Sequence, residues 1–513
     1  MANRAAALVA QANREPGRIA IVHEGREIGF GDLAEQVYHV AGALAAQGIG
    51  QGSRVGLMMP AQPEFIVIQY ALFVLGAVFA PLNIFYRPAE VGHVVDCCEL
   101  EYLILADPLV DRRPPDGDGH TASLRAVITA GVLLEAAAAA VPVRSLAPVA
   151  AQDTAMLLQT SATTGKSKGV VLSAGALAAN YDQTPGWLGV GRDDVIICAL
   201  PLYNTFGLNQ CINAMIHTGA RLVILPRFDA TRVIATVAQQ RGTFMPAVPT
   251  MLQKIVDEPS LRPGQLASLR RIMTGGAPVP AALLARVLAV TAADTQVLTG
   301  YGLTEAAALV TLTAVRLGAD GELEHGNTIG KVLSGMDLAV VDEAGALLPV
   351  GATGEFVVRG PNLMAGYHRA PEDTATALRD GWLHTGDIGY VAPDGYAYIV
   401  DRKKDVIIRG GQNIYPAEIE EAIYRVPGVA EVAVVGEPDD MFGEVVVAWV
   451  APAAGAVLDP AALAARCRED LASFKQPSAF HIVAELPKGP TGKILRRALR
   501  GADPATGAPK AAA

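Results

Sequence analysis

A chain of 513 residues is too long for a single hydrophobic core, and at roughly 150 residues per domain it predicts about three units. The composition, with 51% hydrophobic and 18% charged residues, excludes a largely disordered chain. The net charge of −10 argues against a nucleic-acid partner, which needs a broad basic surface.

The cysteines indicate a reducing compartment. There are five of them, an odd number, and none has the spacing of a zinc site. We therefore expect buried thiols rather than a disulfide framework, and a cytoplasmic location. The first residues carry too short an apolar stretch for a secretory signal.

The first 150 residues alternate between helical and strand-like patterns. Residues 33–47 predict an amphipathic helix, and residues 54–59 and 102–105 predict strands. Such alternation is typical of parallel sheets covered by helices. A second α/β unit is expected from Leu172 to the strand before Gly300.

Residues 65–80 are almost entirely apolar and are similar to a membrane span. A helix of that length reaches only ~24 Å, short of the ~30 Å hydrocarbon core, and Pro81 would end it. We predict a buried helix and no transmembrane segment.

From residue 330 the pattern changes to short alternating strands separated by Gly, Asp and Pro. Strands are predicted at 338–341, 354–358 and 396–400, which indicates a small β-barrel-like unit. Beyond Asp401 a compact α+β module is expected, with a helix at 416–425 and a strand at 431–435.

Residues 160–169 read TSATTGKSKG and follow a short apolar strand at 155–158. Glycine backbone, hydroxyls and two lysines suit a polyanion such as a nucleotide triphosphate. A P-loop needs glycine at position 160, where the chain has Thr160, so that interpretation fails. Taken alone, the segment could equally be an ordinary Ser/Thr/Gly turn.

Four more motifs follow in order: YGLTE at 301–305, TGD at 385–387, DRKKD at 401–405 and PTGK at 490–493. Their order, spacing and identity resemble the acyl-adenylate-forming superfamily, which contains acyl-CoA synthetases, peptide-synthetase adenylation domains and firefly-type luciferases. The resemblance extends from about Gly29 to Arg497, and the GGQNIYP segment at 410–416 is most similar to the acyl-CoA synthetase branch.

With the patterns above, the resemblance implies an α/β fold in two domains. The large N-terminal domain, residues 1–401, would hold two stacked parallel-sheet subdomains and the small β-barrel-like subdomain. The small α+β C-terminal domain, residues 402–513, would be mobile, with Asp401 as its hinge.

The implied reaction has two halves. A carboxylate attacks the α-phosphate of ATP and releases pyrophosphate, and a thiol then displaces AMP from the acyl-AMP. Because the carboxylate is already ionised at neutral pH, the first half needs charge stabilisation and alignment rather than a general base. ATP, Mg²⁺ and CoA are the expected cofactors and co-substrates.

The resemblance assigns roles to individual residues. Lys493 would bridge the acyl carboxylate and the α-phosphate, Thr304 would contact that phosphate, and Glu305 would bind Mg²⁺. ATP or AMP contacts are further expected from Thr160, Ser161, Thr163, Thr164, Gly165, Lys168, Gly276, Ala277, Pro278, Gly300, Tyr301, Gly302, Asp387 and Arg402.

Outside these motifs, a Thr-Glu pair would more often begin a helix, and Asp387 and Arg402 would be a turn carboxylate and a surface arginine. CoA contacts are expected from Gly410, Gly411 and Lys475.

By the same analogy, the acyl pocket would be lined by small or apolar side chains and one amide: Asn204, Phe206, Val248, Pro249, Gly275 and Ala306. No aspartate near Asn204 is available to pair with an α-ammonium, so an apolar acid (fatty, aryl or bulky polycyclic) is expected rather than an amino acid. Ala162, Ser167 and Asn204 depart from the usual glycine, proline and histidine of the family.

Three functions are consistent with the sequence. The first is an acid–CoA ligase that acts on a hydrophobic carboxylic acid. The second is a free-standing adenylating enzyme that loads a separate carrier protein. The third is a non-catalytic acyl-nucleotide-binding protein. The oligomeric state stays open, with a homodimer as one option.

Overall fold

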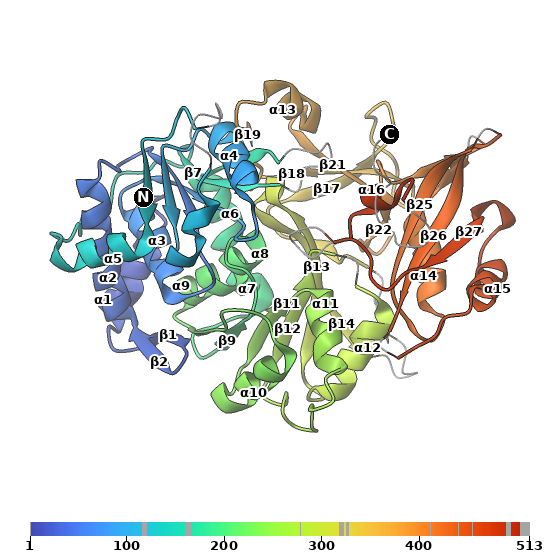
Figure 1. The fold of residues 1–513 in the computed structure, drawn as a ribbon, viewed down its shortest axis with the longest axis horizontal. Helices are drawn as coiled ribbons and strands as arrows, with labels where there is room; N and C mark the ends of the chain where they lie inside the picture. The colour runs from blue at the N-terminus through green and yellow to red at the C-terminus, as the bar shows by residue number, and fades with distance from the viewer. Residues whose placement is uncertain are drawn as a thin grey trace. The chain divides into compact units, whose positions relative to one another are not determined.

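The computed structural model describes residues 2–114, 121–160, 167–277, 279–317, 323–324, 328–410, 412–439, 441–453, 455–488 and 494–502. The chain divides into two compact units. The first contains Met1–Leu338 and Val358–His384, and the second contains Ala339–Val357 and Thr385–Ala513. Figure 1 labels their helices and strands.

The first sheet of the first unit has seven strands among the described residues, and its centre is parallel. In sheet order the strands are β19 (Gly366–Tyr367), β8 (Gly169–Ser173), β7 (Thr154–Gln159), β4 (Val78–Pro81), β3 (Arg54–Met58), β5 (Tyr102–Leu105) and β6 (Ala126–Thr129). Strand β8 is the exception, since it runs antiparallel to both of its neighbours, β7 and β19. The strands predicted at 54–59 and 102–105 are therefore confirmed.

The second sheet of this unit has ten strands among the described residues, with a parallel run from β13 to β1. The strands are β15 (Leu323–Glu324), β14 (Ala308–Leu317), β13 (Gln296–Leu303), β12 (Arg271–Gly275), β11 (Phe244–Ala247), β9 (Val195–Cys198), β10 (Arg221–Ile224), β1 (Ile19–His23) and β2 (Arg26–Gly29), with β16 (Lys331–Val332) paired to β14.

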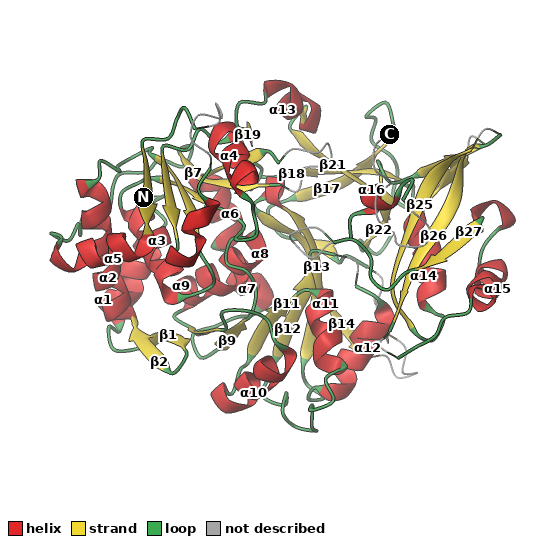
Figure 2. Cartoon of the chain, in the orientation of Figure 1, coloured by secondary structure: helices red, strands yellow, loops and turns green. Residues whose placement is uncertain are grey.

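Helices pack around both sheets of the first unit (Figure 2). They are α1 (Ala6–Arg14), α2 (Phe30–Ala46), α3 (Pro63–Val74), α4 (Pro88–Cys97), η1 (Asp107–Arg112), α5 (Ala130–Ala139), α6 (Ala174–Tyr181), α7 (Thr184–Leu188), α8 (Thr205–Gly207), the π-helix η2 (Leu208–Asn213), α9 (Ala214–Thr218), α10 (Ala230–Gln240), α11 (Pro249–Val256), α12 (Ala281–Val290), η3 (Thr304–Ala306) and α13 (Pro371–Ala377). The amphipathic helix predicted at 33–47 is α2.

The single helix predicted over 65–80 is wrong in its second half. Helix α3 ends at Val74, Gly76 has φ +66°, and the chain continues as strand β4. A left-handed glycine ends a helix at little cost, and Val78 to Pro81 gain strand pairing with β3. The segment is buried as predicted, and nowhere in the described chain is a helix both long and apolar enough to span a membrane.

The boundary predicted at Leu172 between the two α/β subdomains is also wrong. Leu172 lies in β8, which pairs with β7 in the first sheet. Conversely, the β1–β2 hairpin near the N-terminus joins the second sheet through β10. Both strands pair with partners distant in sequence, which local patterns do not reveal.

A small five-stranded sheet holds β17 (Asp337–Val341), β18 (Gly354–Arg359), β21 (Trp382–Val391), β20 (Leu378–Arg379) and β22 (Ala397–Arg402). The division of the chain into units passes through β17, β18 and β21. These strands match the short strands predicted between residues 330 and 400. This division does not test the boundary predicted at 401/402, which concerned where a mobile domain begins. That boundary stays a prediction.

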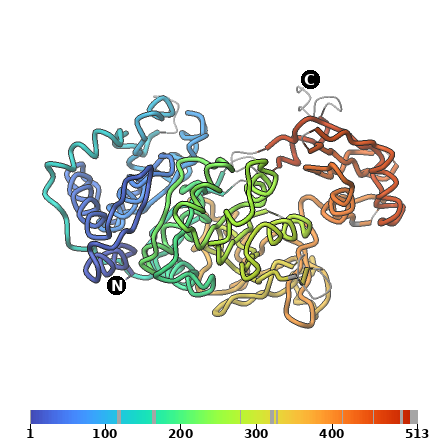
Figure 3. The backbone as a smooth tube through the Cα atoms, turned by 90° about the horizontal axis from the view of Figure 1, so that it is seen from below, coloured from blue at the N-terminus to red at the C-terminus, as the bar shows by residue number. Residues whose placement is uncertain are grey.

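The rest of the second unit forms the expected α+β module, drawn in orange and red in Figure 3. Its sheet contains β24 (Gln412–Ile414), β23 (Ile407–Arg409), β26 (Gly443–Pro452), β25 (Val429–Asp439) and β27 (Ala479–Ile482), with helices α14 (Pro416–Tyr424), α15 (Pro460–Asp470), η4 (Ser473–Lys475) and α16 (Arg496–Leu499). Ile419 and Leu463 pack on one face of this sheet, and Leu486 and Leu499 pack on the other around Trp449.

All five cysteines are free thiols, as predicted. Cys97 is half-buried, and Cys98, Cys198, Cys211 and Cys467 are buried.

Candidate active site

Several predicted acyl and adenine contacts lie where parallel strands of the ten-stranded sheet end. Strands β13, β12, β11 and β9 are neighbours in that order (Figure 1). The carboxyl ends of parallel strands meet at one edge of a sheet, which is where open α/β folds bind ligands. The structure therefore brings Val248, Pro249, Gly275, Gly276, Ala277, Gly300, Tyr301 and Gly302 to one edge. Pro278 lies outside the described residues.

Asn204 and Phe206 belong to the same edge through β9. The chain leaves β9 at Cys198 and starts the short helix α8 after Asn204, which is its N-cap residue. Asn204 and Phe206 are half-buried, and the π-helix η2 follows directly. π-helical turns are rare and frequent at functional sites, which is consistent with a ligand-binding role for this segment.

The turn after Tyr301 needs close backbone contacts. A Cβ on Gly302 would lie 1.8 Å from the backbone oxygen of Ala308, and the β13–β14 register shifts between Tyr301 and Gly302. Ala307 has φ +58° and Ala308 has φ +141°. Such angles cost L residues on the order of 1 kcal/mol each and cluster at active sites. The strain lies directly after Ala306, which the sequence assigned to the acyl pocket.

Thr304 and Glu305 form the next turn, η3, and both are half-buried. The Tyr367 hydroxyl donates a hydrogen bond to Glu305 Oε1 at 2.9 Å. Burial and the adjacent Glu305 charge raise the pKa of Tyr367. Sequence reasoning missed this tyrosine, because β19 is a two-residue strand without periodicity; the only signal was the Gly-Tyr pair ahead of a Pro-x-x-Thr helix start.

The donor set at η3 suits a magnesium–nucleotide complex better than an all-protein metal site. Within the described parts of the chain, no three His, Cys, Asp or Glu side chains are grouped to hold a metal ion. Mg²⁺ is usually bound by one or two carboxylates together with substrate phosphates. One half-buried carboxylate, Glu305, next in sequence to the hydroxyl-bearing Thr304, fits that pattern.

The two ends of the predicted phosphate loop are held together. Thr160 N–H donates to Lys168 O at 3.1 Å, and Ser167 Oγ donates to Thr160 O at 2.8 Å. Lys168 forms an ion pair with Asp373 at 2.5 Å. The intervening Ser161, Ala162, Thr163, Thr164 and Gly165 lie outside the described residues, so their predicted contacts stay predictions.

In the second unit, the two predicted ribose contacts are partners. Asp387 in β21 faces Arg402 in β22, and Arg402 Nε lies 2.7 Å from Asp387 Oδ1. Asp387 is 3% exposed, whereas Arg402 is exposed. The structure thus presents the buried Asp387 carboxylate paired with the guanidinium of the exposed Arg402. A carboxylate can accept hydrogen bonds from both hydroxyls of a diol.

The predicted hinge residue Asp401 is buried at 4% exposure. Its carboxylate accepts hydrogen bonds from Arg402 N–H at 2.7 Å and from Ala417 N–H at 2.8 Å, at the start of α14. Burial raises the pKa of Asp401 to about 6, against the opposing effect of these two donors.

Among the predicted CoA contacts, Gly410 has φ +57° in the turn between β23 and β24. Lys475 lies 2.7 Å from Glu418. Gly411 and the predicted catalytic Lys493 lie outside the described residues.

A family model described as AMP-binding enzyme matches residues 8–368, and one described as AMP-binding enzyme C-terminal domain matches residues 418–493. The chain belongs to the AMP-binding enzyme family. This AMP-binding enzyme is 36% identical over 505 residues to a feruloyl-CoA synthase from an Amycolatopsis species, covering 96% of this chain and 97% of the relative.

Two more relatives cover the AMP-binding enzyme nearly end to end. A 3-[(3aS,4S,7aS)-7a-methyl-1,5-dioxo-octahydro-1H-inden-4-yl]propanoyl:CoA ligase from Mycobacterium tuberculosis is 35% identical over 508 residues, covering 94% of this chain and 96% of the relative. The fatty acid–[acyl-carrier-protein] ligase ScoC from Streptomyces coeruleorubidus is 34% identical over 504 residues, covering 95% and 94%.

Among solved structures, ATP-bound MatB from Rhodopseudomonas palustris superposes on this AMP-binding enzyme with a TM-score of 0.89 at 32% identity, covering 97% of this chain and 98% of that one. The predicted fold class is confirmed, as is the resemblance to the acyl-CoA synthetase branch of the acyl-adenylate-forming superfamily. The protein is an AMP-forming acyl-CoA synthetase, a class that consumes ATP and CoA.

Proposed function

We propose that this synthetase activates a hydrophobic carboxylic acid (fatty, aryl or bulky polycyclic) as its acyl-AMP and then forms the CoA thioester. The observation that carries the proposal is the neutral set of side chains at the ends of neighbouring strands: Asn204, Phe206, Val248, Pro249, Gly275 and Ala306. None of these six can neutralise an α-ammonium group or a second carboxylate on the acid.

The alanine run from Ala306 to Ala308 also favours a bulky acid, because each of these side chains is only one methyl group. The relatives' names point in the same direction: feruloyl is an aromatic acyl group, and the M. tuberculosis relative is named for a bicyclic propanoyl group.

For the first half-reaction, we propose that Thr304 contacts the α-phosphate and that Lys493 holds acid and phosphate together. Asp387 and Arg402 bind the ribose, and Glu305 holds a magnesium–ATP complex. Mg²⁺ would supply charge neutralisation on the phosphate oxygens. Because the acid is already ionised, these residues need only align it and offset repulsion between two anions.

For the second half-reaction, we propose that the domain formed by residues 402–513 turns about Asp401 and withdraws Lys493. Gly410, Gly411 and Lys475 then serve the thiol substrate. Both backbone donors to the Asp401 carboxylate, Arg402 N–H and Ala417 N–H, belong to the domain that would turn. Such a hinge concentrates the conformational change in a few residues.

The experiment is pyrophosphate release measured across a panel of fatty, aryl and polycyclic acids, with amino acids and dicarboxylic acids as comparison. We expect turnover with the hydrophobic acids and none above background with the amino acids and dicarboxylic acids, which carry a second charged group. Preference for an amino acid or a dicarboxylic acid would overturn the assigned substrate class. Absence of acid-dependent pyrophosphate exchange with every acid of the panel would also overturn the assigned substrate class.

A second candidate acceptor is a carrier protein, since one relative is named as an acyl-carrier-protein ligase. Thioester formation with CoA should be compared with formation on a phosphopantetheinylated carrier at equal acyl-AMP supply. A larger kcat/KM for CoA supports the main proposal, and a larger value for the carrier replaces it.

A further inference from the structure

Residues 362–368 connect two elements of the proposed ATP site. On one side the segment pairs with β8, the strand that follows the phosphate loop. Ala365 N–H donates to Val171 O at 2.9 Å, and His368 N–H donates to Gly169 O at 2.8 Å. Tyr367 itself is registered with Val170. The segment is therefore tied to the end of the phosphate loop.

On its other side the same segment contacts the η3 turn through three hydrogen bonds. Asn362, which is fully buried, donates from Nδ2 to Ala306 O at 2.8 Å. Met364 N–H donates to Glu305 O at 2.8 Å. Tyr367 Oη donates to Glu305 Oε1 at 2.9 Å. Two of these bonds fix the backbone of the turn, and the third reaches the carboxylate.

The ring of Tyr367 also contacts the phosphate-loop lysine. Lys168 Nζ lies 5.2 Å from the ring centroid, within the range of a cation–π interaction, and pairs with Asp373 in α13. One side chain thus touches both Lys168 and Glu305. Because the hydroxyl donates to Oε1 of Glu305, it restricts the orientation of that carboxylate.

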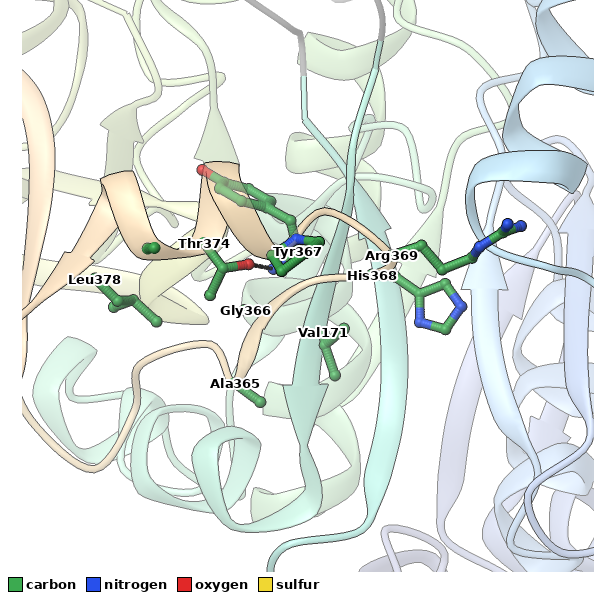
Figure 4. A pocket seen from close by; sticks show the side chains of 10 residues that line it. Val171, Ala365, Gly366, Tyr367, His368, Arg369, Thr374 and Leu378 are labelled. Atoms are coloured by element: carbon green, nitrogen blue, oxygen red, sulfur yellow. Dashed lines mark hydrogen bonds between the residues drawn. The ribbon is translucent and has the colours of Figure 1, made fainter.

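The turn between β19 and α13 holds Tyr367 in place. Thr374 Oγ accepts from Tyr367 N–H at 2.8 Å, as Figure 4 shows, and donates to Ala370 O at 2.8 Å. Gly366 has φ +147°, and a Cβ there would lie 2.7 Å from the Thr374 methyl carbon. Gly366, Tyr367 and Thr374 also line a cavity of about 410 Å³.

We propose that Tyr367 is a positioning residue for Glu305: its hydroxyl orients the carboxylate that holds the magnesium–ATP complex. The inference rests on the proposed role of Glu305. Partners of metal-binding carboxylates commonly change metal affinity or activity by roughly 10- to 100-fold when they are removed. Removal of one hydroxyl should produce a change in that range.

The test compares Tyr367→Phe with wild type in both half-reactions. The Mg²⁺ concentration for half-maximal pyrophosphate exchange should rise roughly 10-fold or more, while the KM for the acid stays unchanged. Thioester formation from supplied acyl-AMP should also be unchanged, which shows in the same sample that the variant folds. Tyr102→Phe is the matched control, because it removes a buried tyrosine hydroxyl that donates to Gly48 O at 3.4 Å.

A binding measurement separates this inference from the proposed function. Mn²⁺ binding in the presence of α,β-methylene ATP, followed by electron paramagnetic resonance, needs no turnover. We expect weaker binding in Tyr367→Phe and in Glu305→Gln, and no further loss in the double variant. If Glu305→Gln binds Mn²⁺ as wild type does, the role of Glu305 fails, and the inference fails with it. If Glu305→Gln is weakened but Tyr367→Phe is not, only the inference is overturned. Equal losses that add in the double variant would also overturn it.

Discussion

The buried Asp401 carboxyl should make the stability of the second unit depend on pH. Its pKa rises from 3.8 to about 6 because burial disfavours the charged form. Between about pH 4 and pH 6 the folded state therefore binds more protons than the unfolded state, so stability from this group falls as pH rises through that window. A shift of about two units corresponds to about 3 kcal/mol, of which roughly half is lost between pH 5 and pH 8.

Asp401→Asn isolates this effect, because asparagine has nearly the same shape and does not titrate. Asparagine loses one of the two bonds from Arg402 N–H and Ala417 N–H, which changes stability by about 1 kcal/mol at every pH. The difference in unfolding free energy between variant and wild type should therefore shift in favour of the variant by about 1–2 kcal/mol from pH 5 to pH 8.

Urea unfolding followed by tryptophan fluorescence measures this difference. Trp449 is fully buried in the second unit, so a background with Trp187→Phe and Trp382→Phe reports on that unit alone. Asp394→Asn is the control: Asp394 is exposed and accepts from Tyr396 N–H at 3.2 Å. A pH-independent difference for Asp401→Asn, or a difference of opposite sign, would show that burial does not raise the pKa of Asp401 in this way.

Three further predictions concern other contacts. Arg496→Met should destabilise the second unit by about 3–5 kcal/mol in urea unfolding, because Glu420, which is 8% exposed, loses the guanidinium that lies 2.7 Å away. As a control, Arg425→Met removes an exposed ion pair and should cost less than about 1 kcal/mol. Equal losses in the two variants would contradict this prediction. Arg402→Ala should raise the KM for ATP roughly 10-fold or more in initial-rate pyrophosphate release without changing the KM for the acid, and the reverse pattern would exclude a ribose role. Gly302→Ala should abolish pyrophosphate exchange, because the new Cβ would lie 1.8 Å from Ala308 O and displace the turn. Circular dichroism should show that the variant still folds. Full activity would show that the turn can move without loss of function.

Local patterns predicted the elements that carry their own signal. The helix α2 and the strands β3 and β5 follow from periodicity, and the motif residues at the ends of β12 and β13 fall where parallel strands place ligands. The pair Asp387–Arg402 was expected to serve one ribose, and the two residues are in contact.

What sequence could not show depends on partners far along the chain. Residues 65–80 are almost entirely apolar, so their hydrophobic pattern does not distinguish helix α3 from strand β4, and only Gly76 marks the change. The sequence around Leu172 predicts a strand but not the sheet to which the strand belongs, because that depends on its pairing with β7. Tyr367 and Glu305 are 62 residues apart in the chain and are joined by a single hydrogen bond. Such a contact produces no periodic pattern in the sequence.

Both half-reactions should be measured in Lys493→Ala with a hydrophobic acid that the wild type turns over. We expect acid-dependent ATP–pyrophosphate exchange to be lost, while thioester formation from supplied acyl-AMP and CoA is largely retained. Equal loss of both, or retained exchange, would contradict the role proposed for Lys493.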